Sequence, residues 1–100
     1  MATSVIATHV FGTKDVSSAG TALILDATNY ELSSLMIIAH NDNTGQIYYG
    51  GSDVDSSTQR GLDAGESIVL GMSRTPIVLN TVYIDAGTTN DGVDFVGVRL

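Results

Sequence analysis

The two histidines, His9 and His40, are the residues in this chain best suited to bind a metal or to move a proton. Each lies beside apolar residues in a segment that predicts a strand. A zinc site needs three or four ligands at short spacing, and neither histidine has a second histidine or a carboxylate pair at such a spacing. The chain also has no Cys, which excludes thiolate ligands and nucleophiles. We therefore expect both histidines to be strand residues, partly buried or at a subunit contact, and we expect no cofactor.

Carboxylates gather in the stretch from residue 53 to residue 66, at Asp53, Asp55, Asp63 and Glu66. Calcium takes oxygen ligands of this kind, but the twelve-position loop with its terminal Glu is not reproduced. Asp53 follows Gly50-Gly51, where glycine frees the backbone and an Asp side chain can bond its own backbone in a turn. The Asn90-Asp91 pair invites the same interpretation. We expect turns at these places rather than a calcium site.

Catalysis is not expected of this sequence. No Gly-x-Ser-x-Gly elbow is present, and residues 61–65 (Gly-Leu-Asp-Ala-Gly) lack the lysine and the helix of a phosphate-binding loop. The sequence does not decide whether two carboxylates lie at the separation of a glycosidase pair. A chain of 100 residues, however, leaves little wall for a substrate cleft.

The charge balance argues against nucleic acid and membrane partners. Eleven acidic residues against four basic ones give a formal charge of −7, and the basic residues are scattered along the chain. Phosphate binding needs clustered Lys and Arg, and an anionic membrane surface attracts the same clusters. The first residues do not resemble a signal peptide, and no apolar run approaches the roughly 20 residues of a spanning helix. Synthesis in a cytoplasm is therefore expected.

Short apolar runs separated by turn residues predict an all-β fold. We expect seven or eight antiparallel strands, at residues 4–11, 21–25, 35–40, 47–49, 66–70, 77–79, 82–86 and 94–100. Residues 12–20 are expected to form a polar loop, and residues 26–34 an irregular link or a single helical turn. This spacing is typical of a single-domain β-sandwich or jelly-roll-like barrel over residues 1–100.

Three local expectations bear on how the strands pair. The turn at residues 41–45 predicts an antiparallel hairpin between residues 35–40 and 47–49. Pro76 cannot donate to a ladder and marks a strand start or an edge. Residues 4–11 carry apolar side chains on both faces, so this strand is expected to be covered on both sides.

The stretch from residue 47 to residue 70 carries a resemblance. Its Ile-Tyr-Tyr-Gly-Gly-Ser-Asp-Val, followed by Leu-Asp-Ala-Gly-Glu-Ser, resembles a small β-sandwich module of tailed-bacteriophage virion proteins. Such modules occur in capsid decoration (cement) proteins, head fibres and tail or baseplate appendages. The similarity covers about residues 35–86, and residues 35–100 form the family-like core.

The resemblance implies a structural protein on the capsid surface of a virion, with the major capsid protein as its partner and a homotrimeric assembly. Residues 1–34 do not match the common pattern, and in proteins of this kind such a segment contacts the capsid or a neighbouring protomer.

Contact residues are expected in the N-terminal strand and among the tyrosines. Tyr48 and Tyr49 must lie on opposite faces of a regular strand, and outward aromatics serve as interface contacts or carbohydrate platforms. Ordinary packing across strands is the alternative. The expected interface residues are Val5, Ile6, His9, Phe11, Tyr48, Tyr49 and Tyr83. The tyrosines and the polar loop at residues 55–60 suggest an alternative function. The protein would then be a receptor- or glycan-binding module of a head fibre, tail fibre or baseplate.

Overall fold

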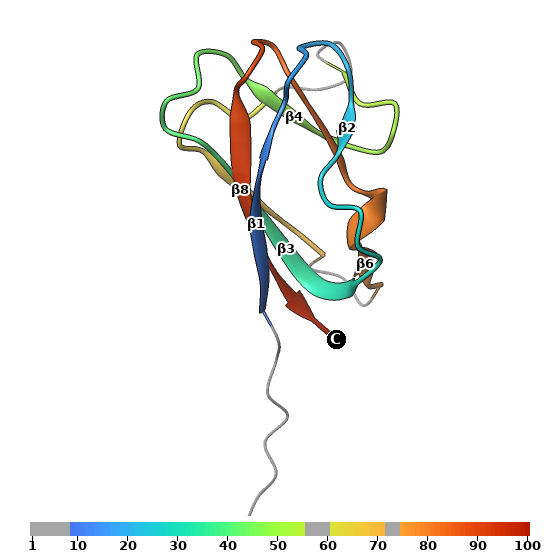
Figure 1. Ribbon diagram of the computed structural model, residues 1–100. Helices are drawn as coiled ribbons and strands as arrows, with labels where there is room; N and C mark the ends of the chain where they lie inside the picture. Colours follow the sequence, from blue (N-terminus) through green and yellow to red (C-terminus); the bar gives the residue numbers. More distant parts are fainter. Residues whose placement is uncertain (1–8, 56–60, 72–74) are drawn as a thin grey trace, which may run out of the picture.

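Two antiparallel sheets face each other in the computed structural model, which describes residues 9–55, 61–71 and 75–100 (Figure 1). The expected all-β sandwich is confirmed, as is its strand number of about eight. The strands are β1 (His9–Asp15), β2 (Leu23–Ile24), β3 (Glu31–Ala39), β4 (Ile47–Gly50), β5 (Ser67–Leu70), β6 (Ile77–Val78), β7 (Tyr83–Ala86) and β8 (Gly92–Arg99). A short 3₁₀ turn, η1 (Leu79–Thr81), joins β6 to β7.

The larger sheet has the strand order β1-β8-β3-β5, and β6 pairs with the first residues of β3. The smaller sheet has the order β2-β7-β4. We call them sheet A and sheet B. Both strands that precede residue 34 belong to these ladders, because β1 pairs with β8 over seven residues and β2 pairs with β7.

The core lies between the two sheets and is built by alternation along the strands. Leu35, Ile37 and Ala39 of β3 point inward and are buried, and Ile84 and Ala86 of β7 meet them from sheet B. A side chain on every second residue of a strand lies on the same face, so these residues form the inner face of each sheet. Leu32 is buried as well, since the β3–β8 register shifts between Leu32 and Ser34 and brings this residue back to the inner side.

The predicted loop at residues 12–20 is wrong in its first part, because β1 continues to Asp15. Gly12 is not a turn residue there. A Cβ placed on Gly12 would lie 2.9 Å from Cζ of Phe95, so the missing side chain lets the buried Phe95 ring come close to the strand. Residues 4–8 of the predicted strand lie outside the described residues.

The predicted hairpin at residues 41–45 is wrong. β3 belongs to sheet A and β4 to sheet B, so the connection crosses from one layer to the other. Polar side chains hold this crossing in place. Asn43 exchanges two hydrogen bonds with the backbone of Gly92, and the Asp91 carboxylate accepts from the backbone N–H groups of Thr44 and Gly45.

The alternative of a helical turn within residues 26–34 is also wrong. Glu31 begins β3 and pairs with Val78, and the Tyr30 carbonyl accepts from the Leu79 N–H at 2.9 Å. Pairing with distant strands therefore satisfies the backbone groups that a local turn would have used.

Glycine is also used differently from expectation in the turns. Gly65 has a φ of 81° in the turn before β5, whereas Gly50, where backbone freedom was expected, ends β4 without a positive φ.

Candidate functional site on the outer face of sheet A

An apolar band crosses the outer face of sheet A, on the side turned away from sheet B. The strand registers place Phe11, Val96, Met36 and Val69 in one row across β1, β8, β3 and β5. Phe11 is 79% exposed and Val69 is 46% exposed, while Val96 and Met36 are partly buried. We call this row, with its neighbours Ile38 and Val98, the outer apolar band.

The band exists because the two central strands carry apolar residues on their outer face as well. These outer residues are Met36 and Ile38 of β3 and Val96 and Val98 of β8, whereas Asp94 of β8 is polar. Strands of this composition are typical of sheets covered on both sides. Among the residues that the structure describes, sheet B covers the inner face, and no second layer covers the band. An exposed apolar patch on a soluble protein marks a binding site more often than a scattered apolar residue does.

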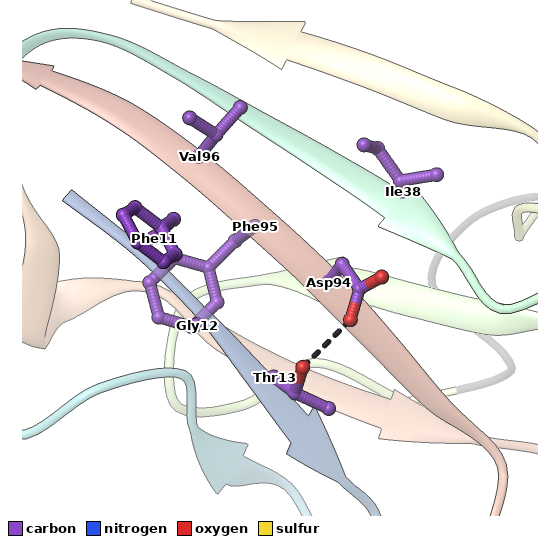
Figure 2. Close-up of a pocket in the computed structure, with 7 residues that line it drawn as sticks. All are labelled: Phe11, Gly12, Thr13, Ile38, Asp94, Phe95 and Val96. Carbon is purple, nitrogen blue, oxygen red and sulfur yellow. Dashed lines mark hydrogen bonds between the residues drawn. The ribbon is translucent and has the colours of Figure 1, made fainter. Parts of the chain in front are cut away.

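A shallow pocket of about 360 Å³ lies within the band (Figure 2). Its lining comes from three adjacent strands, β1, β8 and β3. The lining residues are Phe11, Gly12, Thr13, Ile38, Asp94, Phe95 and Val96. Thr13 donates a hydrogen bond of 2.7 Å to Asp94, so one rim of the pocket is polar and the rest is apolar. Such a pocket suits an apolar side chain of a partner better than a charged ligand.

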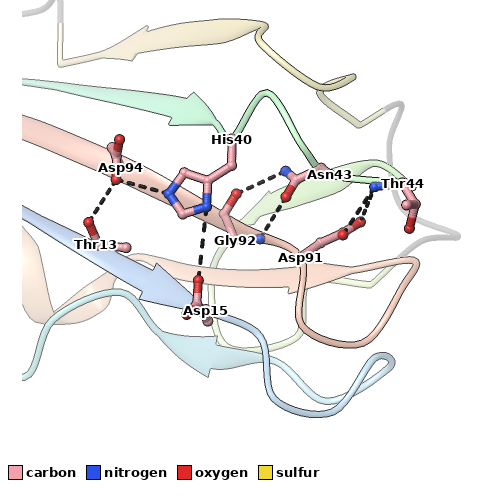
Figure 3. A network of polar contacts seen from close by, with 8 residues as sticks. All are labelled: Thr13, Asp15, His40, Asn43, Thr44, Asp91, Gly92 and Asp94. Atoms are coloured by element: carbon pink, nitrogen blue, oxygen red, sulfur yellow. Dashed lines mark hydrogen bonds and ion pairs between the residues drawn. The ribbon is translucent and has the colours of Figure 1, made fainter.

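A polar cluster borders the pocket at the end of the sheet (Figure 3). Nε2 of His40 lies 2.9 Å from Oδ1 of Asp94, and Nδ1 of His40 lies 3.9 Å from Oδ1 of Asp15. The hydrogen bond from Thr13, and after it the one with His40, hold the pKa of Asp94 below its usual range. The cluster therefore ties β1, β8 and the end of β3 together.

The hydrogen bonds within the cluster run through Asp94. The Thr13 hydroxyl donates to the Asp94 carboxylate, and the same Oδ1 atom lies within hydrogen-bond distance of His40. Within the described ranges, no group of three or more His, Asp or Glu residues could hold a metal ion. In the acidic stretch, the Glu66 side chain stabilises a turn, because its carboxylate accepts a hydrogen bond of 2.7 Å from the Asp63 backbone N–H.

Two buried carboxylates also serve the backbone. Asp85 is 1% exposed and accepts from the backbone N–H groups of Gly20 and Ala86. Asp91 is 6% exposed and, as described above, caps the crossing between the sheets. Because each carboxylate is satisfied by backbone donors, both are structural groups.

The structure separates the interface residues expected from sequence. His9 and Phe11 lie exposed on the outer face of β1. Tyr49 lies on the inner face of sheet B and packs against the core. Tyr48 and Tyr83 share the outer face of sheet B, where both are partly buried. Val5 and Ile6 lie outside the described residues.

The middle of the outer apolar band was not predicted from the sequence. Met36, Ile38 and Val69 belong to runs that were correctly predicted as strands, but their faces were not assigned. Val96 and Val98 lie two residues apart in β8 and share its outer face. A usable signal was the run of apolar residues at successive positions in the middle of two strands, at residues 35–39 and 95–96.

Comparisons with known proteins add no identification, because no family model, curated protein or solved structure matches this chain. In the part of the chain that the structure describes, no helix has the length and apolar character needed to cross a membrane.

Proposed function

We propose that this protein is a bacteriophage capsid decoration protein, which binds the major capsid protein on the outer surface of the head and stabilises it. The outer apolar band is the observation that carries the proposal. It offers a partner an apolar row across four strands, with a pocket in its middle. The resemblance of residues 35–86 to phage virion modules supplies the class of partner.

Binding alone is sufficient for this role. A protein that binds the assembled head but not its dissociated subunits stabilises the head by mass action. No catalytic group is needed for binding of this kind. The virion location is part of this proposal and is supported by the resemblance alone. The resemblance also implies a homotrimer, an assembly that the proposed binding role does not require.

The proposal is tested with purified heads that lack the protein. Added wild-type protein should bind in a fixed stoichiometry and raise the temperature at which the heads release their DNA. Val96→Asp places a charge in the centre of the band and should reduce binding at least tenfold, since an unpaired carboxylate would have to be desolvated. Tyr83→Ser is the matched control, because Tyr83 lies on the outer face of sheet B. Equal binding by the Val96→Asp and Tyr83→Ser proteins would contradict the proposal.

A receptor- or glycan-binding module is the second candidate, and the same variants address it. Tyr48 is partly buried and lies against the chain at Gly61, where a Cβ would come within 2.8 Å of its ring. It therefore offers less open ring surface than a carbohydrate platform requires. If the protein bound host cells saturably, and Tyr83→Ser abolished this binding while Val96→Asp did not, this second function would replace the first.

A further inference from the structure

We propose that two copies of this protein associate through the free edge of β1, in an antiparallel pairing about a two-fold axis at Gly12. The partner is a second copy of the same chain, and the pairing joins two copies of sheet A into one continuous sheet. This inference does not depend on the proposed function. It replaces the three-fold assembly implied by the resemblance with a two-fold one.

The first step is the direction of the backbone groups of β1. Val16 donates to the Asp91 carbonyl at 2.8 Å, and Asn90 donates to the Val16 carbonyl at 2.8 Å, so Val16 turns its backbone groups toward β8. Asp15 lies opposite Gly92, whose backbone groups bond to His40 and Asn43 on the side away from β1. In an antiparallel ladder, residues whose backbone groups point toward the partner strand alternate with residues whose groups point away from it. The backbone groups of His9, Phe11, Thr13 and Asp15 therefore point away from β8, and no described strand pairs with them.

The second step is the length and regularity of this edge. Edge strands are commonly short, bulged, interrupted by Pro or marked by charged residues, and of these devices β1 has only the charges of Lys14 and Asp15 at its end. β1 has seven residues, no Pro and an unbroken register with β8. The opposite edge strand, β5, has four residues and is followed by Gly71 at a φ of 82°. The open edge of β1 is thus the longer and more regular of the two.

The third step is the register. A two-fold axis at Gly12 sets His9 opposite Asp15 of the second copy, and Phe11 opposite its Thr13. All four residues with outward backbone groups are then used in each copy. This gives about eight N–H···O bonds, two for each hydrogen-bonded pair. Shifting the axis by one residue of the strand in either direction leaves some of these groups unpaired.

The side chains of this register are complementary. The imidazole of His9 would face the exposed Asp15 carboxylate of the second copy, twice in the dimer. Phe11 would stand beside Thr13 of the second copy, which lines the apolar pocket. Because hydrogen-bonded pairs project their side chains to the same face, each Phe11 ring can reach the pocket of the other copy. The pairing therefore covers the residue that the monomer leaves 79% exposed.

A proline variant tests the pairing without disturbing the β1–β8 ladder. Thr13→Pro removes an N–H that points to the open edge, so the fold should be retained while the dimer is lost. Thr13→Val is the matched control, since it removes the hydroxyl bond to Asp94 but keeps the N–H. Sedimentation equilibrium at about 0.15 M salt, where surface charges are screened beyond roughly 8 Å, should show dimers for the wild type and Thr13→Val. A tenfold or greater weakening is expected for Thr13→Pro, with unchanged circular dichroism.

A cross-link tests the register and does not depend on the proline variant. The natural chain has no Cys. With His9→Cys and Asp15→Cys in one chain, the predicted pair has a Cα separation of about 5.5 Å, which suits a disulfide. Mild oxidation should give a covalent dimer. Each single variant should give no covalent dimer under the same conditions, because the two cysteines of the paired copies would lie about 20 Å apart.

Three results would overturn the inference. They are a wild-type mass of a monomer or a trimer at about 0.1 mM, a folded Thr13→Pro protein that dimerises as well as Thr13→Val, or equal cross-linking of the single and double Cys variants. Head binding and self-association are two separate measurements on the wild-type protein, so failure of the dimer and failure of the proposed function are distinguishable.

Discussion

The two faces of sheet A are built from the same kind of residue and serve different purposes. The inner face carries Leu35, Ile37 and Phe95, all nearly fully buried against sheet B. The outer face carries Met36, Ile38 and Val96 at the intervening positions, and these remain partly exposed. Apolar character therefore does not distinguish a folding surface from a binding surface in this sheet. The distinction comes from what the chain places over each face.

The largest effect is expected on the inner face. Phe95→Ala removes a ring that packs into the core beside Gly12, and should lower the free energy of unfolding by about 3–5 kcal/mol. Chemical denaturation measures this loss. Val98→Ala, on the outer face of the same strand, is the control. A loss as large from Val98→Ala would erase the proposed difference between the faces.

The next effect concerns the crossing that allows sheet B to cover the inner face. Asp91→Ala removes the acceptor for two backbone N–H groups in the 41–45 connection and should cost roughly 1–3 kcal/mol. Asp42→Ala, in the same connection but exposed, should cost much less. Thermal unfolding of the two variants provides the measurement, and equal melting temperatures would contradict the assigned role of Asp91.

A smaller effect on stability is expected on the outer face. Phe11→Ser should change the free energy of unfolding by no more than about 0.5 kcal/mol, because the ring is largely solvated in the monomer. The measurement must be made at a protein concentration where the wild type is monomeric. A loss above about 2 kcal/mol would show that Phe11 supports the fold, and the band would then lose its most exposed member as a binding residue.

The smallest effect is a change in pH dependence at the border of the band. The folded-state pKa of Asp94 is lowered, chiefly by Thr13 and then by His40. Its stabilisation is therefore present above the unfolded pKa and is lost as the pH falls through the folded value, below about pH 4. Asp94→Asn should lose less stability than the wild type over this acid range. Parallel pH profiles from denaturant midpoints would show that the cluster does not stabilise the folded state.

Much of the sandwich could be predicted from sequence, because the strand signals are local. Alternating or continuous apolar runs located β3, β4, β5 and β7 within a few residues. Which of those strands pair with one another could not be predicted from local signals. The turn at residues 41–45 has hairpin composition, yet it crosses between sheets because Asp91 and Gly92, nearly fifty residues later, hold it.

The candidate site was only partly predictable for a related reason. Phe11 and His9 were identified as surface contacts, and the structure places both on the outer face. Whether Met36 or Leu35 faces the core depends on which face sheet B covers, and the sequence of β3 is apolar at both positions. The tyrosines of β4 and β7 were all expected as interface residues, but Tyr49 packs against the core inside the sandwich.

The position of β8 between β1 and β3 has a consequence for how the chain folds during synthesis. β1 pairs with residues 92–98, so after Asp15 the chain must grow by 77 residues, to Gly92, before β1 has its first ladder partner. Closing so long a loop before its contacts form slows folding, and all-β domains of this kind fold in milliseconds to seconds. During translation the edge groups of β1 remain open on both sides, and premature pairing between nascent chains becomes a competing reaction.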